Sequence, residues 1–381
     1  MKPFRTHISI KDDAWLINGK PTYEGHYHLG NKVEGLLFLS RTIVGIFDDE
    51  NKFTRELWKY PDTGVWDPMR NTRELVEYLP VYKSYGLNTI TIGLQGGSPL
   101  AYRAPRDKVM KNLEDRGVTA SEEEVYEGTV DYYRVQPWHN SAFRPDGSLK
   151  PEFMERLTMV IEKADELGMV VIVQLFYFGQ DERLKDEKAI KTAVTNACKW
   201  VLEKSYTNVL IDITEECNSP GYEHEILLPH RVHELIEIAK KVNHNGRRLL
   251  VGTGYASRAP DDNVVAVSDM IMFSGNGLDP EGIVECVERT REQPSYKPMP
   301  ILYTEDDHYE FEKPVNNFTA ALSAYAGWGY FDNSGETTPD THANPEVGNY
   351  KDGYQNIPVN WGISSIRKKA FFNLLRKVTG T

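Results

Sequence analysis

The chain has little cysteine, no long apolar run and a deficit of basic charge, and each absence excludes a class of protein. Its three cysteines, Cys198, Cys217 and Cys286, lie too far apart to build a disulfide framework, and none forms a C-x-x-C pair for zinc or redox chemistry. No stretch approaches the ~20 continuous apolar residues that cross a bilayer. Acidic residues outnumber basic ones by 56 to 44, a net charge of −12, so we expect neither nucleic acid nor a membrane as a partner.

The beginning of the chain also lacks a targeting signal. Met1-Lys2-Pro3-Phe4 is not followed by an apolar h-region, so we expect a cytoplasmic location by default, or a secreted or periplasmic one if the chain is a trimmed form. What is abundant is aromatic surface, 11% of the 381 residues, including 21 Tyr and 7 Trp. Aromatic rings with polar handles suit a ligand that has apolar faces and many hydroxyls, such as a carbohydrate.

The organisation of the chain predicts an α/β fold. Residues 1–24 alternate around an Asn18-Gly19 turn and predict a β-hairpin. After it, an amphipathic helix pattern, a Gly or Asn break and a short apolar run recur. One example is the helix predicted over Pro151–Leu167, which precedes the strand Met169–Leu175, and another is the helix predicted over Val232–Val242.

Eight such apolar runs are separated by helical patterns, which favours a closed (β/α)8 TIM barrel over a doubly wound open sheet. The open sheet would also favour a Gly-rich phosphate loop, and Gly93–Gly97 has neither the P-loop nor the dinucleotide spacing. We predict one domain over residues 1–381, with rim insertions at 98–147 and 334–361. The predicted strands are Tyr23–His28, Thr89–Leu94, Met169–Leu175, Val209–Thr214, Leu249–Gly254, Met270–Phe273, Ile301–Thr304 and Gly327–Phe331.

In such a barrel the chemistry lies at the carboxyl ends of the strands. Carboxylates gather at the ends of the fourth and seventh strands, as Glu215-Glu216 and Glu305. Two opposed carboxyls, one protonated and one ionised, are what glycoside hydrolysis needs, although adjacent acids can also form plain rim salt bridges. The residues predicted at strand ends as substrate-binding groups are Glu215, His26, His28, Gln95, Gln174, Tyr177, Asn218, Tyr255, Asn276, His308 and Trp328.

Several segments resemble clan A glycoside hydrolases, the family 5 cellulase-like group. Ile211–Asn218 resembles the fourth-strand motif of that group, and Met299–Glu305 resembles its seventh-strand motif. Leu16–Pro21 is similar to the hairpin that leads into the first strand, and Gly86–Ile90 is similar to the segment that leads into the second. Trp328 stands where the group often has an eighth-strand Trp.

The resemblance implies a retaining hydrolase that acts on a β-linked sugar or oligosaccharide by double displacement, without a cofactor. Glu216 matches the general acid/base and Glu305 the nucleophile. Three positions depart from the group. Glu215 replaces the Asn that holds the sugar 2-hydroxyl, Thr91 stands where an Arg near the nucleophile is usual, and Ser274 and Asn276 replace a common His or Tyr.

Two alternatives remain open from the sequence. His26-Tyr27-His28 has the H-x-H spacing with which amidohydrolase-like barrels bind a divalent metal, and Asp332 could join these ligands. A non-catalytic carbohydrate-binding barrel would carry the same fold without turnover. The sequence predicts no oligomeric state.

Overall fold

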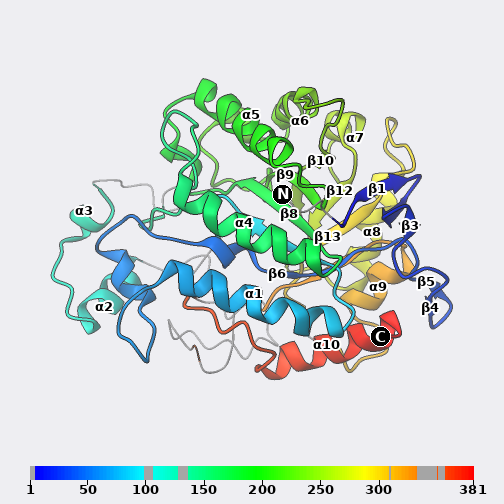
Figure 1. Ribbon diagram of the computed structural model, residues 1–381, viewed down its shortest axis with the longest axis horizontal. Coiled ribbons are helices and arrows are strands. Elements are labelled where there is room, and N and C mark those ends of the chain that lie inside the picture. The colour runs from blue at the N-terminus through cyan, green and yellow to red at the C-terminus, as the bar shows by residue number, and fades with distance from the viewer. Residues whose placement is uncertain (1–4, 98–105, 128–135, 309, 333–349, 351–356) are drawn as a thin grey trace.

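The computed structural model describes residues 5–97, 106–127, 136–308, 310–332, 350 and 357–381. Helices surround a core of parallel strands, with α5, α6 and α7 above it and α1 and α10 below it in Figure 1. The helices of the repeat are α1 (Pro68–Ser84), α4 (Pro151–Glu166), α5 (Glu187–Glu203), α6 (Val232–Lys241), α7 (Asp262–Val267), α8 (Pro280–Arg291), α9 (Asn317–Ser323) and α10 (Ile366–Thr379).

The strands form a closed ring, which confirms the predicted barrel. Six of them pair in parallel in the order β10-β9-β8-β7-β6-β14. Because β10 continues into β11 after Thr253, and β11 pairs with β12 and β12 with β13, the remaining gap lies between β13 and β14. The amide of Gly327 donates to Ile301 and the amide of Tyr303 donates to Gly327, which closes that gap. The strands are β6 (Phe38–Arg41), β7 (Thr89–Gly93), β8 (Val170–Phe176), β9 (Val209–Thr214), β10 (Val251–Gly252), β11 (Gly254–Ala256), β12 (Ile271–Ser274), β13 (Ile301–Glu305) and β14 (Trp328–Tyr330).

The first predicted strand was wrong, whereas the other seven overlap a barrel strand. The first barrel strand is β6, not Tyr23–His28. Residues 23–36 instead form turns and the two-residue ladder of β4 (Tyr27–His28) and β5 (Asn31–Lys32) before β6 begins. This segment lies at the end of the barrel where the strands start, because the Tyr23 hydroxyl donates to Gly86 O, just before β7.

The predicted N-terminal hairpin is present and plugs that same end of the barrel. It consists of β1 (Ile8–Lys11), β2 (Ala14–Ile17) and β3 (Lys20–Pro21), and Asn18 and Gly19 have positive φ at the turn. Figure 1 shows the hairpin at the right-hand end of the strands. Ile8 and Trp15 join an apolar cluster inside the barrel that is separate from the main core; its other buried members are Leu37, Leu39, Val170, Ile172, Leu210, Met270, Met272 and Leu302.

The helices form where the sequence supplies both an apolar stripe and a cap. Asp279 accepts a hydrogen bond from the Gly282 amide at the start of α8, and Pro280 occupies the first helical position, where its missing N–H costs nothing. In α4 the buried positions recur every three or four residues and pack against β8. Most apolar area is therefore buried between the barrel and its ring of helices, and the larger core cluster lies there.

The first rim insertion lies at the carboxyl end of β7, and the described residues of the second contact α1, where Trp361 Nε1 donates to Asn71 O. The first contains α2 (Arg106–Asp115) and α3 (Glu122–Val125), on the left in Figure 1, and it returns to β7 through a bridge between Gln95 and Ser141. Residues 98–105, 128–135, 334–349 and 351–356 of the insertions lie outside the described residues. Among the described helices, none combines the length and the apolar character that crossing a membrane requires.

Candidate active site

Three charged side chains meet at the carboxyl end of the barrel. Arg41, the last residue of β6, donates from Nε to Glu305 Oε2 and from Nη2 to Glu215 Oε1, the latter at 3.2 Å. Arg41 and Glu215 are each 3% exposed and Glu305 is 4% exposed. One buried guanidinium therefore contacts two buried carboxyl groups that arrive from different strands.

Glu305 is held by donors on several sides. Asn276 Nδ2 donates to Glu305 Oε1 at 2.5 Å, and the Ser274 hydroxyl lies 3.5 Å from the same oxygen. Burial acts to raise the pKa of Glu305, but the Arg41 charge and the hydrogen bonds from Glu215, Asn276 and Arg41 outweigh it, so that the pKa lies below its usual value. This carboxyl is consequently ionised over the ordinary pH range.

Glu215 and Glu216 follow β9 directly, and both turn toward this site. In a regular strand neighbouring side chains point to opposite faces, but Glu216 has a φ of +51°, a left-handed conformation that is uncommon for residues other than glycine. Burial, followed by the charge of Glu305, raises the pKa of Glu216 to about 7, while a hydrogen bond from Ser274 opposes the rise. Glu216 is half-buried, in contrast to Glu215.

Below the carboxyls, the barrel interior carries a polar layer. Gln174 Nε2 donates to Asp212 Oδ2 at 3.0 Å, and the Gly254 amide donates to Asp212 Oδ1 at 3.0 Å. Burial raises the pKa of Asp212 to about 7. The predicted residue Gln174 thus lies inside the barrel with a structural partner, and its Oε1 has no hydrogen-bond partner among the residues that the structure describes.

Gln95 and Tyr177 support the rim rather than project freely from it. Gln95 Nε2 donates to Ser141 Oγ and to Gln180 O, both at 3.0 Å, which ties the first insertion to the loop after β8. Tyr177 packs directly under Gly96, where a Cβ would come within 1.9 Å of its ring. Gly96 also has a φ of +71°, so this close approach requires glycine.

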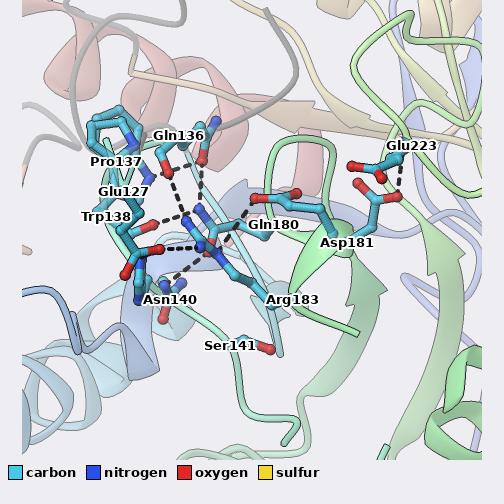
Figure 2. Close-up of polar contacts among 12 residues, drawn as sticks. Glu127, Gln136, Pro137, Trp138, Asn140, Ser141, Gln180, Asp181, Arg183 and Glu223 are labelled. Atoms are coloured by element: carbon cyan, nitrogen blue, oxygen red, sulfur yellow. Dashed lines mark hydrogen bonds and ion pairs between the residues drawn. The ribbon is translucent and has the colours of Figure 1, made fainter. Parts of the chain in front are cut away.

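Figure 2 shows how the loop after β8 holds the segment 136–141, with which the insertion returns to the barrel. Gln180 Nε2 donates to Trp138 O at 2.7 Å and Gln180 Oε1 accepts from the Asn140 amide at 3.0 Å. Arg183 Nη2 donates to Gln136 O at 3.0 Å and Arg183 Nη1 pairs with Glu127 at 3.2 Å. Side-chain contacts of this kind fix the shape of the rim beside the carboxyls.

Two predicted site residues lie behind the strands instead. Tyr255 is fully buried, and the Asp261 amide donates to its hydroxyl at 3.4 Å. Trp328 stacks on Phe318 of α9, and its Nε1 donates to Asp306 Oδ2 at 2.9 Å. Both side chains face the helices, because alternation along β11 and β14 directs them away from the barrel axis.

The histidines of the H-x-H segment lie at the opposite end of the barrel. They belong to the β4–β5 region, where the His26 ring lies against Gly380 after α10 and a backbone group of Lys377 hydrogen-bonds His28. The metal alternative rested on Tyr23–His28 as the first strand, so these two residues do not meet the carboxyls. In the described part of the chain no group of three or more His, Cys, Asp or Glu side chains could hold a metal ion.

Asn276 is the predicted substrate-binding residue that, together with Glu215, touches the nucleophile candidate directly. Asn218 lies nearby after β9, where its side chain makes two hydrogen bonds with the backbone of Ala256, at 2.7 and 3.0 Å. The backbone N–H of His308 donates to Asp306 Oδ1, and its ring lies 3.5 Å from Glu310.

The sequence reasoning missed Arg41 and Phe331. The Arg41 guanidinium lies 4.3 Å from the centre of the Phe331 ring, just after β14. Position 91 carries a threonine where an arginine was expected, and Arg41 of β6 is the arginine that contacts Glu305. The signal was the apolar run Leu36–Leu39 followed by Ser40-Arg41.

No protein-family model and no curated protein sequence matches this chain. Among solved structures, it is similar to the GH5-4 broad specificity endoglucanase from Clostridium longisporum, with 11% identity, 90% of this chain and 97% of that chain covered, and a TM-score of 0.50. It is also similar to the exo-beta-1,4-mannosidase Op5Man5 from Opitutaceae bacterium strain TAV5, with 12% identity and a TM-score of 0.50.

That match covers 97% of this chain and 62% of the mannosidase chain. At identities this low, the structural match establishes the architecture, and the chemistry has to be argued from the residues of the site. This protein therefore has the (β/α)8 fold of these two glycoside hydrolases, a fold typical of the family 5-like group.

Proposed function

We propose that this protein is a retaining glycoside hydrolase that acts on a β-linked sugar or oligosaccharide. Glu305 is the nucleophile and Glu216 the general acid/base. The observation that carries the proposal is that acids from the ends of β9 and β13 lie at one end of the barrel, where Arg41 and Asn276 contact Glu305. This arrangement lowers the pKa of Glu305, and burial followed by the charge of Glu305 raises the pKa of Glu216 to about 7. Environments that separate two carboxyl pKa values in this way assign one acid and one base.

Glu216 is a better acid/base than its neighbour Glu215. The acid/base must reach the leaving oxygen and later a water molecule, and Glu216 is the half-buried member of the pair. Glu215 is 3% exposed and contacts Arg41. A pKa of about 7 lets Glu216 donate its proton in the first step and remove one in the second.

In the first step, Glu305 attacks the anomeric carbon while Glu216 protonates the departing glycosidic oxygen, and a covalent glycosyl ester forms. In the second step, Glu216 removes a proton from water, which attacks the same carbon and releases Glu305. Arg41 and Asn276 stabilise the negative charge of Glu305 before attack and after release. For this chemistry the two carboxyl groups must stand ~5–5.5 Å apart.

A panel of aryl β-glycosides tests the proposal, combined with a 2-fluoro sugar that traps the covalent intermediate. We expect the label on Glu305, as mapped by mass spectrometry of peptides. Glu305→Gln and Glu216→Gln should each lower kcat by ~10³-fold or more at an unchanged thermal midpoint. A variant that keeps near-normal rates refutes the role of that residue.

The two alternatives from the sequence give different results. Sugar binding without turnover or labelling across the panel would favour a carbohydrate-binding barrel. Activity that is lost on chelation and restored by zinc would favour a metal-dependent hydrolase. In that case the His26→Ala variant should be inactive.

A further inference from the structure

We propose that Glu215 carries a proton in the working enzyme and donates it to Glu305, so that it acts as a neutral positioning residue for the nucleophile. This inference rests on the proposed function for its catalytic consequence. It identifies the task of a third acid in a site whose two steps use only Glu216 and Glu305.

The geometry shows that Glu215 lacks the donors that an ionised carboxylate needs. Its Oε1 accepts from Arg41 Nη2 at 3.2 Å and from Arg41 Nε at 3.4 Å. Its Oε2 is buried and has no hydrogen-bond partner among the described residues. A buried carboxylate oxygen without a donor costs roughly 1–3 kcal/mol, and more when it is charged. A proton on the carboxyl removes that cost if an acceptor lies within reach.

Glu305 is the acceptor within reach. Arg41 Nε contacts Glu305 Oε2 and lies 3.4 Å from Glu215 Oε1, so the two carboxyl groups are neighbours, close enough for a hydrogen bond between them to act on the pKa of each. Two carboxyls can hydrogen-bond only when one of them is protonated. Arg41 Nε contacts both groups, so all three side chains form one buried network.

Charge balance requires that one of the two carboxyls holds a proton, and the unpartnered Oε2 of Glu215 and the Asn276 donor on Glu305 assign that proton to Glu215. The charged groups that act on Glu215 are Glu305 from the end of β13, Arg41 from β6 and its neighbour Glu216, and the Tyr222 hydroxyl donates to its backbone oxygen at 2.5 Å. Asp307 lies beyond, near Glu216, and Asp212 near Glu305. Arg41 is the cation that contacts it. One positive charge cannot balance several ionised carboxyls in a buried site.

The direction of each pKa agrees with this arrangement. Burial, then the charge of Glu305, raises the pKa of Glu215 well above its usual value, although Arg41 opposes the rise. The pKa of Glu305 is lowered, and Asn276 donates to its other oxygen. Glu305 therefore stays ionised and correctly oriented, while Glu215 supplies a hydrogen-bond donor without adding a second negative charge.

The test compares Glu215→Gln, which keeps a neutral donor of the same shape, with Glu215→Leu, which removes it. We expect Glu215→Gln to retain at least a tenth of wild-type kcat/KM at pH 6, whereas Glu215→Leu loses about 100-fold. Above the pKa values of both Glu216 and Glu215, the logarithm of wild-type kcat/KM should fall with a slope steeper than −1, because each of the two carboxyls loses a proton. Glu215→Gln should restore a slope of −1. Equal losses in both variants, or an unchanged slope, would overturn the proposal.

A second measurement does not depend on turnover. ¹³C NMR of protein labelled at the glutamate δ-carboxyl, recorded from pH 5 to 10, reports each protonated carboxyl. We expect one carboxyl with a raised pKa to be present in the wild type, in Glu216→Gln and in Glu182→Gln, and absent in Glu215→Gln. The Glu182 control is needed because burial raises the pKa of Glu182 to about 8.

The two measurements separate the inference from the proposed function. A wild-type protein that shows the raised carboxyl of Glu215 but hydrolyses no glycoside would refute the glycosidase and leave the proton assignment standing. If the wild type hydrolyses glycosides and the Glu215→Gln variant shows the same protonated carboxyls as the wild type, the proton assignment is refuted and the glycosidase stands. A clear preference for glucosaminides over glucosides would also refute the proton assignment, since an ionised Glu215 would then pair with the substrate ammonium.

Discussion

Replacing Arg41 with methionine gives the sharpest test of the electrostatics in this site. Arg41 contacts both Glu215 and Glu305 and is 3% exposed, so the substitution removes the positive charge beside the nucleophile while it keeps much of the side-chain volume. Two unit charges ~4 Å apart interact by about 4 kcal/mol at an effective dielectric constant of ~20. Since 1.36 kcal/mol is a factor of ten, protonation of Glu305 should become about a thousandfold easier.

The expected result is a displaced acid limb in the pH profile of kcat/KM. Glu305 must be ionised to attack, so the variant should lose up to about 30-fold at pH 6, because a thousandfold easier protonation starts from a pKa below its usual value, and it should recover part of that loss as the pH rises. The recovery should stop where Glu216 loses its proton, near pH 7. The assay is hydrolysis of an activated aryl β-glycoside between pH 4 and 9, with a glycoside on which the wild type is active.

Two further variants make the result interpretable. Arg41→Lys keeps the charge but loses the fork of donors and should fall between wild type and Arg41→Met. Arg248→Met removes an exposed arginine that pairs with Asp269 at 2.6 and 2.9 Å, and it should leave the profile unchanged. An Arg41→Met variant that is folded by circular dichroism, keeps its acid limb and stays within threefold of wild type would refute the reasoning.

Three other predictions concern stability and specificity. Asp212→Asn should raise the thermal midpoint above that of the wild type more at pH 8 than at pH 5.5. The folded-state pKa of about 7 exceeds the unfolded value of ~3.9, so the wild type loses stability as the pH rises from ~4 through 7, and about 2 kcal/mol of that loss falls above pH 5.5; the Gln174 amide can rotate to accept from the new amide. Equal pH dependence in both proteins would contradict this. Trp15→Ala should cost ~3–5 kcal/mol in denaturant unfolding because it opens the plug of the barrel, with KM unchanged. Trp328→Phe should cost ~1–3 kcal/mol through the lost hydrogen bond to Asp306 and leave kcat/KM within threefold; a large rise in KM would mean that Trp328 contacts the sugar.

The sequence predicted most of the barrel because fully buried parallel strands have a local signature. Val170–Phe176 and Val209–Thr214 are short apolar runs that follow amphipathic helices, and both are strands in the structure. The first strand was missed for an equally local reason. β6 has only four residues, and the apolar 3-10 helix Ile43–Ile46 follows it almost at once. Residues 38–44 contain no glycine or asparagine, so no break of that kind separates the strand from the helix that follows.

It was harder to predict from the sequence whether an individual side chain points into the barrel or toward the surrounding helices. Trp328 and Phe331 both belong to the eighth strand region, and only the pairing of β14 with β6 decides that Trp328 faces α9 while Phe331 lies over Arg41. A one-residue change of register exchanges the two faces of a strand. The adjacent acids Glu215 and Glu216 likewise reach one site because of the left-handed φ of Glu216, which no local pattern announces.

The sequence by itself determined the repeating strand–helix order, the hairpin before it and the acids at the ends of the fourth and seventh strands. These features depend on residues within one or two turns of each other, so local periodicity records them. The tertiary structure alone decided that Arg41 stands between Glu215 and Glu305, 174 and 264 positions away in the chain. Closure of the ring brings these side chains together in a buried space, and their protonation follows from that proximity and burial, which a linear sequence does not contain.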